Sequence, residues 1–281
     1  MSSPLANTIA LVTGASRGIG KGVALGLGEA GATVYLTART LKPGEGRGPG
    51  TLPQTAEEVT HLGGQGIAVQ CDHTDDTQVA AVFQRIIAEQ GRLDLLVNNA
   101  FNNPVDGIPE NIPFWKLPIG LWDQLISVGL RSHYVASVMA APPMVEQKRG
   151  LIVNISSMGA RMHLNNVVYG VGKAGVEKLT ADTAEELRPH GVAAVSLWPP
   201  YTKTEVVLAE EKPTADTLAR MATPQFTGRA VVALASDPQI MDKTGRRFVV
   251  ASLAEEYGFT DLDGTRPPIP SYARFHGELC G

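Results

Sequence analysis

The sequence predicts an α/β fold in which a doubly wound parallel sheet of about seven strands carries helices on both faces. Three observations lead to this expectation. Short apolar runs alternate with helical stretches along the chain. Runs such as Leu95-Leu96-Val97 and Leu151-Ile152-Val153 are apolar at successive positions, as in strands covered on both faces. A glycine-rich turn, TGASRGIG, separates the first apolar run from the first helical stretch.

The expected strands occupy seven short ranges, residues 8–13, 33–37, 66–70, 93–97, 151–156, 192–197 and 247–250. The helical patterns lie between them, at residues 19–30, 55–62, 76–90, 121–146, 168–188 and 226–235. Pro142-Pro143 interrupts the fourth helix, where we expect a kink or an early end because proline lacks the N–H that an interior helical position donates. The pattern shows no internal repeat and no second core, so we expect residues 1–281 to form one domain.

Other stretches break the alternation. Residues 41–53 are rich in glycine and proline and are expected to form a surface loop. Residues 101–118 contain four prolines and follow the fourth strand. Residues 205–212 are charged and are expected to form a solvated helix. Residues 261–281 have little periodicity and are interpreted as a possible C-terminal arm.

Composition limits the classes of function. The chain has 281 residues, of which 43% are hydrophobic, and a net charge of −4, so nothing favours a nucleic-acid partner or an anionic membrane. Cys71 and Cys280 lie far apart and suggest neither a disulfide framework nor a metal site. No signal peptide is evident, and no apolar run approaches the roughly 20 residues that span a bilayer. We therefore expect a soluble cytoplasmic protein.

The turn at residues 13–20 is the first candidate for function. Its glycines permit a tight turn and a close approach of the backbone, while the start of the following helix offers free N–H groups to a pyrophosphate. Many glycine patterns are plain turns, but a strand before this one and a helix and second strand after it favour a dinucleotide site. The residues expected to bind the cofactor here are Gly14, Ser16, Arg17, Gly18, Ile19 and Gly20.

The end of the second strand indicates which dinucleotide is bound. An NAD site usually has an acidic residue there for the ribose 2′-hydroxyl, whereas the 2′-phosphate of NADP requires a cation. The chain reads Thr37-Ala38-Arg39, and Arg17 lies within the glycine turn. Either arginine alone is explained equally well as a solvated surface charge. Together, at these two positions, they favour NADP(H).

Tyr169 and Lys173 form the second candidate. At positions i and i+4 they lie on one helix face, and Ser157 precedes the tyrosine by twelve residues. A phenol titrates near pH 10 and needs a nearby cation to work as an acid or base at neutral pH, which Lys173 is spaced to provide. Taken alone, this spacing is common on ordinary helix surfaces.

The glycine turn, Asp72 after the third strand, Asn98-Asn99-Ala100, the serine after the fifth strand, the Tyr169–Lys173 pair and residues 199–204 occur in order. In this combination the chain resembles the short-chain dehydrogenase/reductase superfamily. The resemblance implies a Rossmann-type sheet that binds NADP(H) at the carboxyl ends of its strands. It implies catalysis by Ser157, Tyr169 and Lys173, with Tyr169 moving the proton and Lys173 holding the nicotinamide ribose and lowering the tyrosine pKa. Further cofactor contacts are implied for Asp72, Asn99, Pro199, Thr202 and Thr204.

The chain departs from the superfamily pattern at several positions. The usual spacing between serine and tyrosine selects Ser156, whereas the strand register selects Ser157, which we favour. Gly129 occupies the position of the superfamily's asparagine in the proton relay, and Phe101 replaces the glycine after Asn-Asn-Ala. Pro200 replaces the glycine of the turn after the sixth strand, which is expected to stiffen that loop.

Two classes of function follow from the resemblance. The first is an NADPH-dependent carbonyl reductase, or an alcohol dehydrogenase in the reverse direction, with a small-molecule carbonyl or alcohol as substrate. The second is a non-catalytic NADP(H)-binding regulator or scaffold, which the missing asparagine favours and the retained Ser157, Tyr169 and Lys173 oppose. A homodimer or homotetramer is implied as well. A narrower likeness to one subgroup of the superfamily depends on SVGLRSHY (127–134), VVYGVGKAG (167–175), VSLWP (195–199) and EEYGFTDLDG (255–264).

Overall fold

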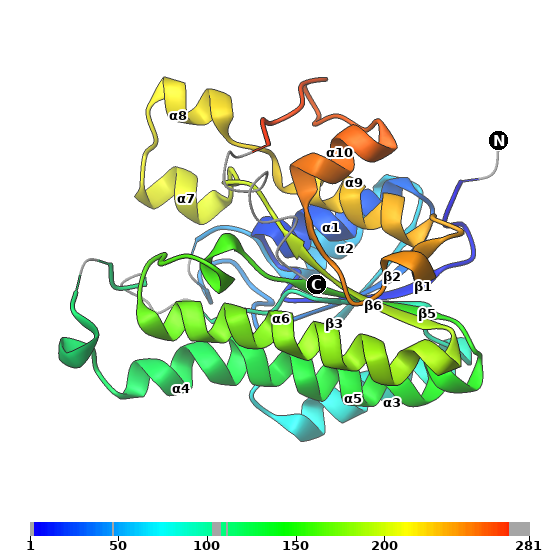
Figure 1. Ribbon diagram of the computed structural model, residues 1–281. Coiled ribbons are helices and arrows are strands. Elements are labelled where there is room, and N and C mark those ends of the chain that lie inside the picture. The colour runs from blue at the N-terminus through cyan, green and yellow to red at the C-terminus, as the bar shows by residue number, and fades with distance from the viewer. Residues whose placement is uncertain (1–2, 47, 103–107, 111, 270–281) are drawn as a thin grey trace.

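The computed structural model describes residues 3–46, 48–102, 108–110 and 112–269 (Figure 1). Within these residues, a single sheet contains seven parallel strands in the order β3-β2-β1-β4-β5-β6-β7. The strands are β1 (Ile9–Thr13), β2 (Thr33–Ala38), β3 (Gln65–Gln70), β4 (Leu95–Asn98), β5 (Gly150–Ile155), β6 (Val192–Trp198) and β7 (Arg247–Val249). All seven expected strands are present, with ends that differ by at most two residues, and the predicted fold class is confirmed.

Helices cover both faces of the sheet, with α1, α2, α9 and α10 above it and α3, α5 and α6 below it in the view of Figure 1. The α-helices are α1 (Gly18–Glu29), α2 (Leu52–His61), α3 (Asp76–Gln90), α4 (Gly120–Ile126), α5 (Ser132–Glu146), α6 (Val167–Leu187), α7 (Glu205–Glu210), α8 (Ala215–Arg220), α9 (Pro224–Ala235) and α10 (Val250–Tyr257). The shorter helices are η1 (Phe114–Lys116), the π-helical η2 (Ser127–Arg131), η3 (Met158–Ala160), η4 (Arg188–His190) and η5 (Ile240–Lys243). The sequence pattern did not predict α8 or α10.

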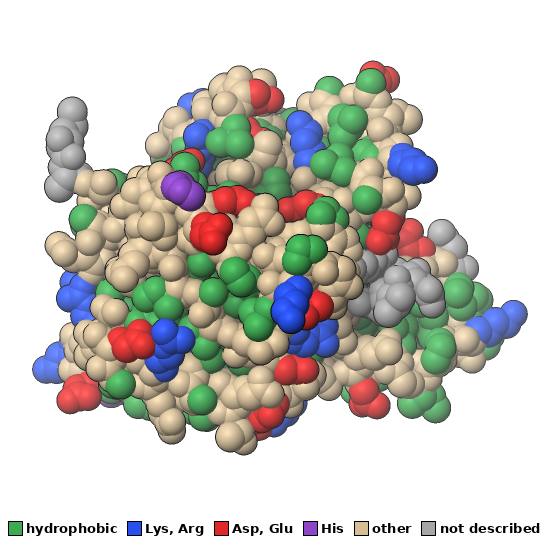
Figure 2. All heavy atoms as spheres, turned by 180° about the vertical axis from the view of Figure 1, so that it is seen from behind, with side chains coloured by type: hydrophobic (Ala, Val, Ile, Leu, Met, Phe, Trp, Pro, Cys, Tyr) green, Lys and Arg blue, Asp and Glu red, His purple; other side chains and the backbone are tan. Residues whose placement is uncertain are grey.

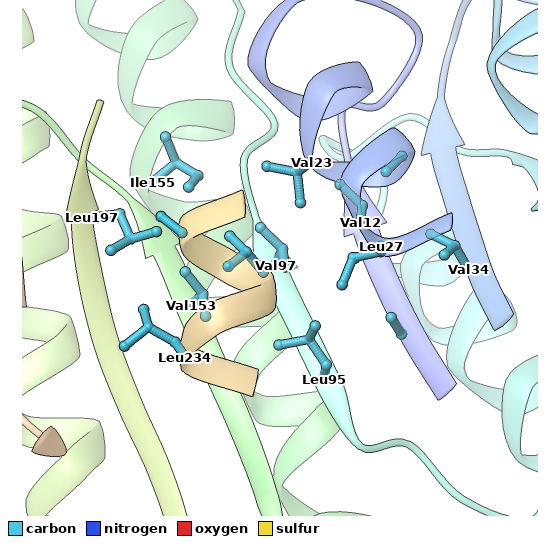
Figure 3. Packing of buried hydrophobic residues seen from close by; sticks show 14 of the residues in the cluster. Val12, Val23, Leu27, Val34, Leu95, Val97, Val153, Ile155, Leu197 and Leu234 are labelled. Carbon is cyan, nitrogen blue, oxygen red and sulfur yellow. The ribbon is translucent and has the colours of Figure 1, made fainter. Parts of the chain in front are cut away.

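The apolar core forms one layer on each face because strand side chains alternate between faces. On β1, Ala10 and Val12 pack toward α1 and α9, whereas Ile9 and Leu11 pack toward α3 and α5. Figure 3 shows the first layer, in which side chains from the central strands meet those of α1 and α9. Burial on both faces explains why the central strands are apolar at successive positions.

Two predicted elements are corrected. The loop expected at 41–53 ends earlier, because α2 starts at Leu52 with Pro53 in its first turn and the Thr51 hydroxyl accepting a hydrogen bond from its backbone. The helix expected at 121–146 is divided into α4, the π-helical η2 and α5. It continues through Pro142-Pro143 to Glu146, so the early end is wrong. Both prolines lie in the last part of α5, and Pro142 is exposed.

Helices α7 and α8 belong to an excursion of the chain between β6 and α9, which we call the α7–α8 segment (residues 203–221). Its two ends meet in a parallel β-bridge between Thr202 and Ala222. The Lys203 N–H donates to the Ala222 carbonyl at 2.8 Å, and the Ala222 N–H donates to the Tyr201 carbonyl at 2.9 Å. The segment, at the upper left of Figure 1, therefore begins and ends at almost the same point, between the end of β6 and the start of α9.

The expected C-terminal arm is attached to the start of α9 at its first residue. Asp261 is buried and accepts hydrogen bonds from both the backbone N–H and the hydroxyl of Thr223. Arg229 of α9 donates to the carbonyls of Thr260 and Asp261 at 2.6 and 3.0 Å. Residues 270–281 of the arm lie outside the described residues.

The distribution of charged side chains on the surface is consistent with the net charge of −4. On the face seen in Figure 2, acidic and basic side chains are interspersed, and apolar side chains are visible on the projection formed by the chain around η1 and α4. This projection includes Phe114, Trp115 and Ile119, which are 62%, 72% and 91% exposed. Among the described helices, none has the length and apolar character needed to span a membrane.

Candidate active site

The strand order locates the site. Order along the sheet reverses between β1 and β4, and in doubly wound folds the crevice at such a switch point, outside the carboxyl ends of the strands, binds the ligand. A groove of about 830 Å³ lies there, lined by the chain that follows β1, β2, β3 and β4 and by the start of α7. Its volume is within the range of cofactor and ligand pockets.

The glycine turn allows the backbone to approach this groove closely. Gly14 and Gly18 have φ values of 68° and 57°, which other residues rarely adopt. A Cβ at Gly14 would lie 2.8 Å from Ala100 Cα, and one at Gly20 would lie 2.4 Å from both the Gly14 carbonyl oxygen and Asn99 Nδ2. Side chains are therefore excluded at these positions, and Arg17, the N-cap of α1, supplies no capping hydrogen bond to the free N–H groups that follow it.

Asn99 and Asp72 fix the neighbouring loops. The Asn99 carboxamide donates to the carbonyls of Thr13 and Gly14 at 2.9 and 3.1 Å, so it joins the end of β4 to the glycine turn. The Asp72 carboxylate accepts hydrogen bonds from the backbone and hydroxyl of Thr74 at 3.0 and 2.9 Å. Both residues also line the groove.

Arg17 and Arg39 place two cations at the end of β2. Arg17 is half-buried and donates to the Thr40 hydroxyl at 3.2 Å and to the carbonyls of Pro49 and Gly50 at 3.3 and 3.0 Å. The loop at 41–51 therefore holds this guanidinium at the groove edge. Burial lowers the pKa of Arg17, and the nearby Arg39 lowers it further, whereas a facing carboxylate raises it. Arg39 is exposed and donates to Asn102 at 3.1 Å.

The carboxylate that raises the pKa of Arg17 belongs to Glu205, the first residue of α7. Its Oε2 accepts a hydrogen bond of 2.8 Å from the backbone N–H of Gly18, at the N-terminus of α1. An anion is thus already bound where a helix start favours phosphate, and it shows that this position accepts negative charge. With the glycine turn open to the groove, the residues present fit the diphosphate of a dinucleotide.

Three residues after β6 were predicted to bind the cofactor, and only one of them lines the groove. Thr204 reaches it, since its Cγ2 lies 3.5 Å from the position of a Cβ on Gly18. Thr202 is buried and its hydroxyl donates to the Pro200 carbonyl at 2.7 Å. Thr202 and Pro199 do not line the groove. The predicted cofactor residues that do line it are Gly14, Ser16, Arg17, Gly18, Ile19, Arg39, Asp72, Asn99 and Thr204.

Tyr169 and Ser157 are in contact. The tyrosine hydroxyl donates to Ser157 Oγ at 2.9 Å. The carboxamide oxygen of Asn166 caps α6 by accepting from the Tyr169 N–H at 3.0 Å, which sets the first turn of the helix and hence the direction of the phenol. Ser156 is buried, and its hydroxyl is directed to the Lys173 carbonyl at 3.4 Å. The geometry therefore supports Ser157 over Ser156 as the partner of the tyrosine.

Lys173 is buried one helical turn after Tyr169. Its ammonium donates to the Ile155 carbonyl at 3.1 Å and lies 5.9 Å from the centre of the tyrosine ring. Burial lowers the pKa of Lys173 to about 8, and the negative charge of Glu177 acts in the opposite direction. Burial raises the pKa of Tyr169, and the hydrogen bond with Ser157 acts in the opposite direction. Lowering of the tyrosine pKa by Lys173 stays a prediction.

Phe101 and Gly129, the two departures from the superfamily pattern, are in contact with each other. A Cβ at Gly129 would lie 2.7 Å from Cε2 of the Phe101 ring. The ring also meets Tyr169 edge to face, with ring centres 5.9 Å apart. Neither this contact nor the role of Glu205 was predicted, because both bring together residues from elements far apart in sequence. The signals in the sequence that could have indicated these contacts are Phe101 and Gly129, which depart from the superfamily pattern, and Glu205 after Thr204.

The fold and this arrangement define an oxidoreductase of the nicotinamide-dependent class, and the comparisons with known proteins agree. Residues 8–214 match the family model described as short chain dehydrogenase. The chain is 44% identical to mouse and 43% identical to human Dehydrogenase/reductase SDR family member 1, covering 97% and 99% of this chain and 88% and 90% of those proteins. A solved metagenomic short-chain oxidoreductase in complex with NADP is 32% identical, with a TM-score of 0.68, over 84% of this chain and 93% of that chain.

The chain therefore belongs to the short-chain dehydrogenase family, and the resemblance inferred from its motifs is confirmed. The narrower likeness to one subgroup agrees with the identity to the two mammalian proteins. Members of this family are oxidoreductases that use a nicotinamide cofactor and act on CH–OH or carbonyl groups of small molecules.

Proposed function

We propose that the protein is an NADPH-dependent carbonyl reductase that also oxidises the corresponding alcohol. The observation that carries this proposal is the hydrogen bond of 2.9 Å between Tyr169 and Ser157, with the Lys173 ammonium buried one turn further along α6. A phenol, a hydroxyl and an ammonium together supply a proton, a hydrogen-bond donor for the substrate oxygen and a positive charge. We propose that the whole chain works as one nucleotide-binding domain.

In the reductive direction the residues have distinct tasks. Ser157 holds the substrate oxygen by a hydrogen bond, and Tyr169 donates its proton to that oxygen as the carbonyl becomes an alcohol. Lys173 holds the ribose of the cofactor and stabilises the phenolate that the transfer leaves. The cofactor, when bound, supplies the hydride that adds to the carbonyl carbon. The opposite sequence of transfers oxidises an alcohol.

The preference for NADP(H) is proposed from charge. Arg17 and Arg39 lie at the end of β2, where the chain has no acidic residue, and both line the groove. Guanidinium groups bind phosphate through paired N–H donors, so these two fit a 2′-phosphate. Arg39 is the better test, because Arg17 also makes three structural hydrogen bonds, to Thr40, Pro49 and Gly50.

The test combines binding and turnover. Purified protein is titrated with NADPH and NADH and then assayed with a panel of ketones and aldehydes. We expect tighter binding of NADPH, loss of that preference in Arg39→Ala, and loss of turnover by a factor of about 10² to 10⁴ in Tyr169→Phe with NADPH binding retained. Equal affinity for both cofactors, or turnover unchanged in Tyr169→Phe, contradicts the proposal. NADPH binding without reduction of any carbonyl supports the non-catalytic regulator instead.

We further propose a homodimer or homotetramer assembled through α5 and α6. Tyr134 and Val138 of α5 are 57% and 45% exposed, and Val171 of α6 is 43% exposed. Large apolar side chains on two adjacent outer helices are typical of an oligomer interface. Light scattering coupled to gel filtration measures the mass, and Val138→Glu is expected to shift it to that of the monomer.

A further inference from the structure

The Phe101 ring lies against the two proton-handling side chains of the site. Its centre is 5.0 Å from Lys173 Nζ, and its edge-to-face contact with Tyr169 has ring centres 5.9 Å apart at an angle of 84°. The only hydrogen bond of the Lys173 ammonium to the described residues goes to the Ile155 carbonyl. An ammonium has three N–H groups, so the electron-rich face of the ring provides a second favourable contact.

The ring has this position because residue 129 has no side chain. Gly129 lies in the π-helical η2 (Ser127–Arg131), and an added Cβ would stand 2.7 and 2.8 Å from Cε2 and Cδ2 of Phe101. Any side chain at 129 requires the ring to move away. The glycine and the phenylalanine are thus two halves of one steric arrangement, contributed by η2 and by the chain that follows β4.

We propose that Phe101 is a positioning residue that holds Lys173 and Tyr169 in the arrangement used for proton transfer, and that Gly129 is the glycine that admits its ring. The superfamily pattern has the reverse distribution, with a glycine at the position of Phe101 and an asparagine at 129. In this chain an aromatic ring is therefore present at 101, where the pattern has no side chain, and the side chain at 129 is absent. The inference rests on the proposed function for its effect on turnover, but not for its effect on the ionisation of Lys173.

Other charged and titratable groups act on Lys173 at the same time. Glu177 raises the pKa of Lys173 from the same helix, while burial lowers it. Tyr169 faces it on α6, and His133 of α5 is buried close enough for the two groups to interact electrostatically. None of these groups is itself altered when only the Phe101 ring is replaced, so a change in the lysine titration reports the loss of the ring, both its contact with the ammonium and the positions that it fixes.

The first test needs no turnover. The ¹⁵N signal of Lys173 Nζ, assigned by its loss in Lys173→Met, is titrated by NMR in the cofactor-free protein. In Phe101→Leu, which keeps an apolar side chain without the aromatic face, we expect the midpoint to fall by about half a pH unit or more, and in Phe101→Tyr to stay at the wild-type value. An unchanged midpoint in Phe101→Leu overturns the proposal.

The second test is a double-mutant cycle on Phe101 and Gly129. Gly129→Asn alone forces the ring out of place and is expected to lower both Tm and kcat. Phe101→Gly alone removes the ring and is expected to lower kcat by about tenfold or more. The double variant, which has the superfamily's usual pair, is expected to recover a Tm and a kcat above those of Gly129→Asn. Additive losses overturn the proposal, and the NMR titration decides if a single variant fails to fold. If the wild type itself turns over no carbonyl, the proposed function fails, while the titration and the Tm cycle still test this inference.

Discussion

The contact between Glu205 and the N-terminus of α1 leads to a quantitative prediction. The Glu205 carboxylate bonds to the Gly18 N–H at 2.8 Å, at the position where a cofactor phosphate is expected. Because both groups are anions and compete for one donor, the carboxylate must leave before the phosphate binds. Replacing it by a neutral amide, in Glu205→Gln, is therefore expected to strengthen NADPH binding.

The magnitude follows from the nature of this contact. A hydrogen bond to a charged group contributes about 1.5–3 kcal/mol in a protein, and an anion at a helix start about 0.3–1 kcal/mol when exposed. Glu205 is partly exposed. We therefore take about 1 to 1.5 kcal/mol, which corresponds to a decrease of roughly five- to tenfold in the Kd for NADPH.

The assay is an isothermal titration of NADPH into wild type, Glu205→Gln and the control Asp216→Asn. Asp216 lies on α8 in the same α7–α8 segment and is exposed, so the control removes one negative charge without affecting the α1 contact. We expect its Kd to stay within about twofold of wild type, as for a screened surface charge. The reasoning is refuted if Glu205→Gln binds NADPH no more tightly than wild type, or if both variants gain equally.

Three further predictions concern packing, pH and the choice of serine. A Cβ at Gly22 would lie 2.1 Å from a backbone carbon of α9, so Gly22→Ala should lower the free energy of unfolding, measured in urea, by about 1–3 kcal/mol. Gly120 has open space around it, so Gly120→Ala should not lower this free energy. Equal stability of the two variants contradicts the prediction. Burial lowers the pKa of His133 to about 3, below its value of about 6.5 in the unfolded chain. Because the unfolded state therefore binds one more proton, the free energy of unfolding falls as the pH drops below 6.5, by about 2 kcal/mol at pH 5. Thermal unfolding between pH 8 and 5 should show this loss reduced in His133→Gln, and an identical slope in the variant argues against it. Ser157→Ala should lower kcat by about 10² while Ser156→Ala changes it by less than about threefold, and the reverse order would select Ser156.

Periodicity was sufficient for most of the fold, for a physical reason. Strands buried on both faces are mostly apolar, and the helices that cover them have apolar residues about every 3.6 positions, so the local pattern reflects the layers of the fold. It failed where the local pattern is weak. Helix α8 has no buried residue, and α10 follows β7 without a break, so neither gives a separate signal. At Pro142-Pro143 the local pattern favoured a kink or an early end, but the helix continues, and Met144 directly after the prolines is buried in the core.

The site residues could be predicted where their role follows from a local sequence pattern. Glycines at a strand end and a tyrosine and lysine one turn apart are local patterns. The choice between Ser156 and Ser157 was not, because it depends on the path of the chain through η3 (Met158–Ala160), up to the cap at Asn166. The hydrogen bond between Glu205 and Gly18 joins residues 187 positions apart, and no spacing rule could anticipate it.

The paired ends of the α7–α8 segment have an evolutionary consequence. Since the two ends of the segment meet at the Thr202–Ala222 bridge, the nineteen residues between Thr202 and Ala222 form a closed loop. The entropy of closing such a loop grows only with the logarithm of its length, so insertions and deletions there cost the frame little. Apart from Thr204, Glu205 and Val206, which line the groove, the residues of this segment can therefore differ between related enzymes without disturbing the glycine turn or α6.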